Sequence, residues 1–484
     1  MRHWRRGHAD TKLSEAISNA YIALFAVAML GSILVNVIVN VARLSDELCT
    51  SAGCREGRSL LPYLVAAGSL AVVLALSRMF GPVFTSPAVA SWLMSTPADR
   101  GALLRPRVWR TVVIAAVVTA ALAAAATTMG RFGTSAILGQ SIAVALVSVL
   151  TVAIAVLGQA GKGLLPRLLS WALTFALWVV LLLLAMHRAP LLDAPEALTS
   201  SGVSTIVALG VVALIVLLAA LRRTPRLHRR DIAAGGNLAP GLSGAMSNLD
   251  LALMYDVLLA HRWRARGSVR SRRGGPVGAG ALVWADLRRV VRSPQWLVLI
   301  AAAVVVPYAV EVAGAERVVF LLAALMGFLT GLPLLTGLRV LTRSASIIRM
   351  LPFPLGLARR VSVYVALGIL VAYGLATVPA LHDSLDVPWT VAFMLGLAVG
   401  GSALASAARW VTGKPPDYGR PLVSSPSGAI PTNLYGSALR GFDVLLLTCA
   451  PVLISPSDIT ALISLGISAV VVSIVTAPQQ QQKN

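Results

Sequence analysis

Twelve long stretches of this chain contain no charged side chain, and they constrain its fold more than any other feature. A helix needs about 20 apolar residues to cross roughly 30 Å of hydrocarbon. Eleven stretches are long enough for a span, whereas Val444–Ser457 has 14 residues and contains Pro451, which favours a kinked or re-entrant segment. The stretches are Ala16–Ala42, Ser59–Ser77, Thr111–Gly130, Phe132–Gly161, Leu168–Met186, Ala197–Leu221, Ser293–Val310, Val318–Leu338, Val361–Leu381, Val387–Ala408, Val444–Ser457 and Ile459–Gln482. We therefore predict an all-α, polytopic transmembrane helical bundle of about 12 spans.

The charge distribution predicts the orientation. Hydrophobic residues make up 57% of the 484 residues, charged residues 12%, and the mean hydropathy is +0.81, beyond what a soluble domain tolerates. With the N-terminus inside, loops on that side hold 35 of the 41 basic residues but 9 of the 19 acidic ones. Basic loops stay cytoplasmic, so we expect a multi-pass protein of the cell inner membrane with both termini in the cytoplasm. No basic surface interleaved with aromatics indicates nucleic-acid binding.

The order of the predicted elements repeats along the chain. Amphipathic segments at residues 1–18 and 281–296 are predicted interfacial helices, and each precedes two spans, a basic loop with prolines and four further spans. An even number of spans separates equivalent elements, so the two sets run in the same direction, as in transporters with parallel repeats. We predict a 6+6 parallel repeat with three parts: an N-terminal half (1–221), a cytoplasmic basic connector (222–292) and a C-terminal half (293–484).

The connector contains 14 arginines and no lysine. Its Gly-rich stretch, IAAGGNLAPGLSG, precedes a predicted helix at Asn248–His261. Near its end the sequence predicts an amphipathic helix with an apolar stripe opposite charged residues, the stripe being Val283, Leu287, Val290 and Val291, and the charges Asp286, Arg288, Arg289 and Arg292. In the C-terminal half, the Pro-, Gly- and Ser-rich segment at residues 409–440 is expected to be irregular.

Two loops occupy equivalent places in the halves, Ser91–Arg110 and Arg349–Tyr364. In the first, a small hydroxyl followed by proline predicts a helix start, formed by Ser95, Thr96 and Pro97. Asp99 and Arg100 follow, and Leu103 and Leu104 are expected to face apolar surface. The second loop has Leu351, Pro352 and Pro354 at the corresponding positions.

Neither a nucleotide-binding nor a catalytic motif is found. The string LGQAGKG at residues 157–163 lacks the first glycine and the final hydroxyl of a GxxxxGK[ST] loop. Cys49 and Cys54 lie in the predicted first outer loop, where a disulfide can form. The third cysteine, Cys449, lies in a predicted span, so four ligands for a structural zinc do not come together.

Polar residues in the predicted spans are few. Asn36 and Asn40 share one helical face and could bond between helices or line a passage. Arg440 and Asp443 could form an interfacial pair near the inner face or line a pathway. Ion-coupled carriers usually keep ionisable groups at mid-membrane, and these spans hold almost none.

The first loop resembles a known coupling element. LMSTPADRGALLRPRVWR, between the second and third predicted spans, is similar to the loop of type-two ATP-binding-cassette (ABC) exporter permeases, where a helix with a "leu-x-thr-pro-x-x-arg" pattern contacts the ATPase. The preceding interfacial helix and six spans per half also agree with that family. The loop MLPFPLGLARR departs from the pattern, since it has no Asp-Arg and carries Leu351, Pro352 and Pro354 instead of the Ser-Thr-Pro.

The resemblance implies two permease halves fused in one chain that moves a hydrophobic or amphipathic substrate. The chain would then be a transport subunit rather than an enzyme, with no cofactor of its own. ATP would be bound by ABC ATPase subunits, a pair of them, and the remaining partner would be membrane lipid. The coupling residues would be those of the two loops, Ser95, Thr96, Pro97, Asp99, Arg100, Leu351, Pro352 and Pro354.

Two other functions stay open. A twelve-span secondary carrier of the major facilitator type also has six-plus-six spans and a long inner connector, and Asp99 and Arg100 echo its Asp-Arg loop motif. The glycine four residues before that Asp and the basic cluster after the motif are missing. A membrane scaffold, or an enzyme acting on lipid-linked substrates, is the third possibility, although no acidic or metal-binding loop is present to carry such chemistry.

Overall fold

The chain folds into a bundle of long helices. The computed structural model describes residues 52–96, 99–161, 164–186, 200–247, 251–266, 274–312, 316–344, 350–413, 423–425, 428–430 and 439–477, together with scattered positions between 21 and 43. Within these residues, ten helices are long and apolar enough to cross a membrane. The protein is therefore a helical membrane protein, as its composition predicts.

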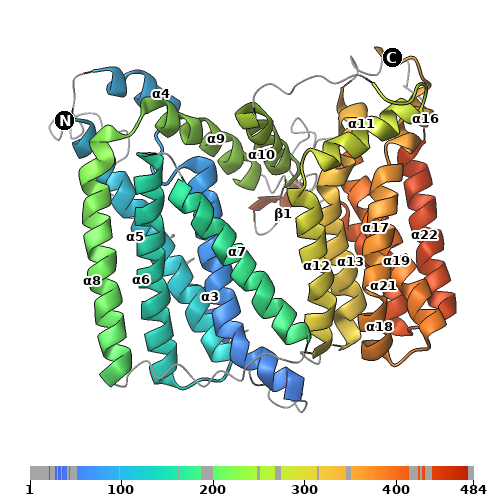
Figure 1. Cartoon of the computed structure of the whole chain (residues 1–484), viewed down its shortest axis with the longest axis horizontal. Coiled ribbons are helices and arrows are strands. Elements are labelled where there is room, and N and C mark those ends of the chain that lie inside the picture. Colours follow the sequence, from blue (N-terminus) through green and yellow to red (C-terminus); the bar gives the residue numbers. More distant parts are fainter. Residues whose placement is uncertain are drawn as a thin grey trace.

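The helices form two groups that lie side by side (Figure 1). Shorter helices, among them α4 (Pro87–Ser91), α11 (Gly280–Val291) and α16 (Leu355–Val361), gather at one end of the bundle. Arginines in the last turns of helices, such as Arg222 and Arg360, lie at the same end. We call it the basic end.

In the first group, one helix lies at the centre. Helix α6 contacts α3, α5, α7 and α8. Near the basic end, fully buried Val83, Leu104, Val108 and Val152 join these helices into one apolar core. The five long helices are α3 (Ala52–Phe80), α5 (Arg100–Met129), α6 (Thr134–Gln159), α7 (Leu164–Ala185) and α8 (Ser200–Arg223).

The second group is arranged around α19, which contacts α13, α17, α21 and α22. Glycines allow α17 and α19 to touch through their backbones, because a methyl group at Gly374 would lie 2.1 Å from the carbonyl oxygen of Gly396. The helices are α12 (Gln295–Val312), α13 (Val319–Gly331), α14 (Thr336–Arg343), α16, α17 (Tyr364–Ala376), α18 (Val378–Leu385), α19 (Trp389–Thr412), α21 (Phe442–Ile454) and α22 (Asp458–Thr476).

The two groups meet in two places. Inside the bundle, α3 and α7 pack against α12, where Leu60 and Val180 contact Ala309 and Val312. At the basic end, the connector forms helices α9 (Arg229–Ser247) and α10 (Leu251–Arg266), which contact each other and lie between the groups (Figure 1).

Two predicted spans are absent from the ten long helices. Ala16–Ala42 lies largely outside the described residues. Val444–Ser457 corresponds to α21, which has 13 residues and a Pro451 inside it, so it is too short for a full span. The other ten predicted stretches each match one long helix, although the helix bounds differ by several residues.

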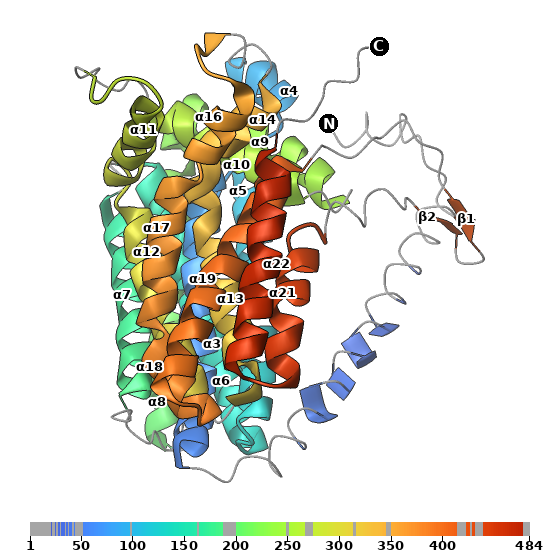
Figure 2. The same ribbon diagram turned by 90° about the vertical axis from the view of Figure 1, so that its right-hand side faces the viewer.

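One stretch for which no structure was predicted is helical, and two local predictions were wrong. The Gly-rich stretch of the connector is helical and forms most of α9. The segment at residues 409–440 contains a two-stranded antiparallel hairpin, Val423–Ser425 with Gly428–Ile430, which stands apart from the bundle in Figure 2. In α11, Asp286 is buried and Leu287 is exposed, because the carboxylate faces the protein and forms an ion pair with Arg289 at 2.7 Å.

Candidate functional site

The first basic-end loop, residues 81–99, is held by hydrogen bonds to its backbone. The Gln159 side chain, at the end of α6, accepts from Val83 N at 3.3 Å and donates to Val83 O at 3.1 Å. Thr111 donates to Pro82 O at 3.1 Å, and Arg107 donates to Phe84 O at 2.9 Å. Because these partners belong to α5 and α6, the loop is joined to two long helices.

Helix α9 covers the other side of this loop at backbone distance. A methyl group at Gly235 would lie 1.7 Å from Phe80 O, and one at Gly236 would lie 1.6 Å from Thr85 O. Thr85 N also donates to Ile232 O at 3.4 Å. No residue with a Cβ fits at either glycine, so the Gly-Gly pair in the connector is needed for this close approach.

The predicted helix start in this loop lies too early in the chain. Helix α5 begins at Arg100, and Asp99 is its N-cap, accepting from Gly101 N at 2.8 Å. A carboxylate caps as well as a hydroxyl does, and Ser95 instead ends a short 3₁₀ helix. Thr96 is exposed, and Pro97 lies outside the described residues.

Arg100 is exposed at the start of α5 and reaches back to Met94 O at 3.4 Å. Leu104 is fully buried, as predicted, while Leu103 is half-buried. The predicted loop helix is therefore the first turn of a 30-residue helix that continues through the bundle. A force on this turn acts directly on the long helix.

The second basic-end loop, residues 344–354, follows α14, which the connector contacts through charges. Arg339 is buried, and its Nε donates to Asp256 Oδ1 of α10 at 2.6 Å. Arg343 forms an ion pair with the other oxygen of Asp256. The Arg339 guanidinium also lies over the rings of Tyr255 and Trp410, 5.3 and 5.2 Å from their centroids.

The predicted residues of this loop lie at the start of α16. Pro354 is its N-cap, with no side-chain hydrogen bond to the helix, as proline requires. Leu351 is half-buried, whereas Pro352 and Pro354 are exposed. Helix α16 is joined to the end of α22, because Arg359 donates to Ala477 O at 3.1 Å.

Each loop carries one large apolar side chain that is almost fully in solvent. Trp92 is 80% exposed in the first loop, and Met350 is 84% exposed in the second. Both therefore lack apolar packing within the described residues. Exposed aromatic and methionine side chains are typical of contact surfaces.

The other predicted site residues make local contacts of different kinds. Asn40 donates to Asn36 Oδ1 at 2.6 Å, so these two bond within one helix, where both are exposed. Asp443, in the first turn of α21, accepts from Gly441 N and Val444 N and lies 3.8 Å from Arg409. The Arg440 side chain lies against Gly413.

The cysteines fall into two kinds. Cys54 is disulfide-bonded, while Cys449 is free and buried. The proposed partner, Cys49, lies outside the described residues, so the Cys49–Cys54 bridge stays a prediction.

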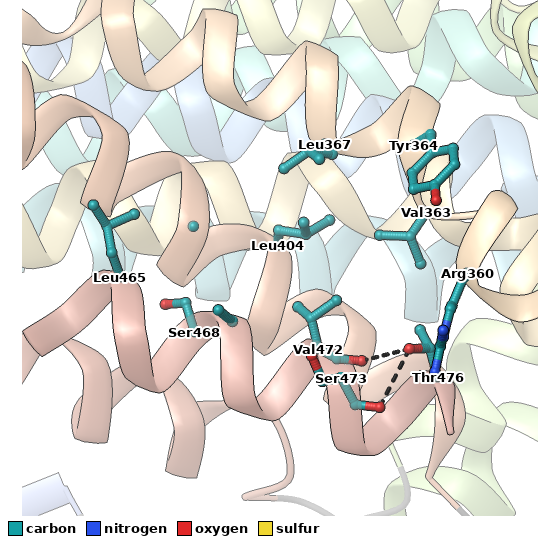
Figure 3. A pocket seen from close by; sticks show the side chains of 12 residues that line it. Arg360, Val363, Tyr364, Leu367, Leu404, Leu465, Ser468, Val472, Ser473 and Thr476 are labelled. Carbon is teal, nitrogen blue, oxygen red and sulfur yellow. Dashed lines mark hydrogen bonds between the residues drawn. The ribbon is translucent and has the colours of Figure 1, made fainter. Parts of the chain in front are cut away.

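A groove of about 560 Å³ opens between α16, α17, α19 and α22. Figure 3 shows Arg360 and Thr476 together at one end and Leu465 at the other, with Val472 and Leu404 between them. Thr476 donates to Val472 O at 2.8 Å, so its hydroxyl is satisfied by its own helix. The groove thus offers an apolar wall with one cation at the basic end.

Sequence reasoning missed the residues that hold the loops. Gln159 was part of a rejected nucleotide motif, although a polar amide closing an apolar helix was a usable signal. The Gly-Gly pair at residues 235–236 was noted only as part of a Gly-rich stretch. Arg339 ended a predicted apolar stretch, and nothing in the sequence links it to Asp256, 83 residues away.

Comparison with known proteins supplies a family. No curated protein matches this chain. Residues 54–421 match the model of a family of unknown function, DUF6297, and this range runs from α3 past the end of α19. Since the match covers more than half of the chain, the protein belongs to the family of unknown function DUF6297.

Proposed function

We propose that the protein is the membrane permease subunit of an ABC-type exporter and is driven by separate ATPase subunits. The observation that carries the proposal is the pair of basic-end loops. Each loop presents one exposed apolar side chain, Trp92 or Met350. The first loop is hydrogen-bonded to α5 and α6, and the second leads into α16, whose Arg359 donates to the end of α22. A partner that binds both loops could therefore move both helix groups.

The helix contacts support a parallel repeat of six plus six spans. Helix α6 contacts α3, α5, α7 and α8, and α19 contacts the helices at the equivalent places in the second group, α13, α17, α21 and α22. Under this repeat Ala16–Ala42 is the first span and corresponds to α12. Helix α21 is then the eleventh element, shorter than its counterpart α7.

The orientation follows from the basic end. Arginines of α8, α11, α14 and α16 gather there, and positively charged loops remain in the cytoplasm. The basic end would then face the cytoplasm of the cell, with both termini and the connector on that side. The chain itself would hold no nucleotide, since ATP would bind to the partner subunits.

The groove in Figure 3 suits a hydrophobic or amphipathic substrate. Its lining combines leucine and valine side chains with Arg360 at one end. A molecule with an apolar body and an anionic group would place the body along Leu367, Leu404 and Leu465. Transport of small ions would require polar ligands along a passage instead.

The test uses variants that leave the fold intact. Trp92→Ser combined with Met350→Ser removes the two exposed side chains, and Val277→Ser is the matched control, because Val277 is 93% exposed in the connector. We expect the wild type and the control to co-purify with an ATPase and to stimulate its ATP hydrolysis. The double variant should lose most of that stimulation, as losing a central contact typically costs about 2 kcal/mol.

Two results would contradict the proposal. If no ATPase associates with the wild type, or if the double variant stimulates hydrolysis normally, the loops are not coupling elements. Substrate uptake into vesicles driven by an ion gradient without ATP would instead favour the secondary carrier.

A further inference from the structure

A second cavity lies at the basic end of the first helix group. It has a volume of about 420 Å³ and is lined by the ends of α3 and α6, the start of α7, and helices α9 and α10. Three of its lining side chains are basic or can become so, namely Arg78, Arg167 and His261. Among the described residues, no aspartate or glutamate lines it.

The two arginines lie close enough to repel each other. Arg78 donates to Ser170 Oγ, which satisfies one of its five N–H groups. The Arg167 side chain makes no hydrogen bond or ion pair within the part of the chain that the structure describes, and its carbonyl accepts from the Ser170 hydroxyl at 2.8 Å. The electrostatic influence of Arg167 on Arg78 is unfavourable for a pair of cations, and no protein carboxylate lining the cavity offsets it.

Backbone groups add to this positive potential. Helix α7 begins at Leu164, three residues before Arg167, so the positive end of its dipole lies near the cavity, although Pro166, which lines it, has no N–H to offer. These features together are those of an anion site.

The depth of the site indicates which anion would reach it. Arg78 lies in the last turn of α3, and Arg167 lies in the first turn of α7. Both helices are long enough to span a membrane, so in a bilayer the two guanidinium groups would lie near the level of the lipid phosphates. Basic pockets between transmembrane helices on the cytoplasmic side bind acidic phospholipid headgroups.

We propose that this cavity binds a phosphate-bearing anion between Arg78 and Arg167, with His261 closing it from the connector. Two sources share this chemistry, the headgroup of an acidic phospholipid and a soluble phosphate. A guanidinium pairs with phosphate through two parallel N–H···O bonds, which suits Arg78 and Arg167 better than a lysine pair. The site also touches Gly81 and Pro82, so its occupant contacts the first basic-end loop.

The experiment measures ligand binding to the purified full chain and requires no ATPase, so its outcome is independent of the proposed function. Native mass spectrometry compares bound phosphatidylglycerol in the wild type, in Arg78→Gln/Arg167→Gln and in Arg167→Gln alone. The control is Arg222→Gln/Arg223→Gln, which removes the same charge from the exposed end of α8. A second arm measures the shift in melting temperature caused by pyrophosphate.

We expect phosphatidylglycerol to bind about tenfold more weakly to the double variant than to the wild type. The control should bind like the wild type, and Arg167→Gln should fall between them, which covers a double variant that fails to fold. Stabilisation by pyrophosphate that depends on the same arginines, without a phosphatidylglycerol preference, would assign the site to a soluble phosphate. Equal binding by the charge-removal control and the site variants in both arms would overturn the proposal.

Discussion

Helix α9 meets the first helix group through glycines, whereas α10 meets the second group through charges. At Gly235 and Gly236 the backbones touch directly, and no side chain lies between them. At Asp256 one carboxylate joins Arg339 and Arg343. A backbone contact depends on shape and is insensitive to salt, while an ion pair depends on burial and on the charge of both partners. The connector therefore has one attachment that tolerates no added atom and another that tolerates no lost charge.

The largest expected effect breaks the glycine attachment. Gly235→Val with Gly236→Val places methyl groups within 2 Å of two carbonyl oxygens, so α9 must leave the loop. We expect a destabilisation of about 4 kcal/mol or more, seen as a loss of monodisperse protein after detergent extraction. Gly244→Val in the same helix is the control, because a Cβ there meets nothing within 4 Å. Equal damage from both changes would show that helix α9 itself, and not its contact, is sensitive.

The second prediction breaks the charged attachment. Asp256→Ala leaves Arg339 buried without its partner, which typically costs about 3 kcal/mol. The melting temperature of the purified protein should fall clearly. Replacing both partners, Asp256→Leu with Arg339→Met, should recover much of the loss because no buried charge remains. A double variant as unstable as Asp256→Ala would show that the ring contacts of Arg339 matter more than its charge.

A smaller effect is expected where the first loop meets α6. Gln159→Leu removes both hydrogen bonds to Val83 and leaves a backbone N–H and C=O without partners. We expect a loss of about 1–2 kcal/mol and faster amide hydrogen exchange at residues 82–85. Gln140→Leu serves as the comparison, because it changes the same residue type within the same helix. Exchange that is unchanged at Val83 would mean that α9 and the hydrogen bonds from Thr111 and Arg107 hold the loop without Gln159.

The smallest expected effect is a change in the pH dependence of stability caused by Asp286 in helix α11. Burial raises the pKa of Asp286 above its ordinary value, partly offset by Arg289, which favours the ionised form. The folded protein therefore binds a proton more readily than the unfolded chain, and this residue's contribution to stability falls as the pH rises through the raised pKa. Asp286→Asn should flatten the decline in melting temperature between the ordinary pKa of an aspartate and the raised pKa of Asp286. A steeper decline in the variant would mean that the ion pair dominates over burial.

The sequence predicted the long helices because apolar length is a local property. Ten of the twelve stretches correspond to long helices in the described residues. The sequence-based predictions were wrong where contacts between distant parts of the chain determine the local structure. Asp99 competes with Ser95 as a cap, and only the packing of Leu104 selects the later start. The Gly-rich stretch looks like a loop by propensity, yet the carbonyls of Phe80 and Thr85 make those glycines necessary in a helix. The ion pair of Asp256 with Arg339 joins distant segments, which no spacing rule reports.

The shortness of α21 has a consequence for the surrounding lipid. Its 13 residues measure about 20 Å, while the 19 residues of its neighbour α22 measure about 28 Å. With the turn at Ser455–Ser457 at the surface opposite the basic end, Asp443 and Arg409 would lie some 10 Å below the surface of an ordinary bilayer at the basic end. Hydrophobic mismatch of this kind is relieved by local thinning or by headgroups and water that move inward. The bilayer around this side of the protein should therefore be locally thinner in the leaflet at the basic end, and lipids there should be tilted relative to those in the bulk.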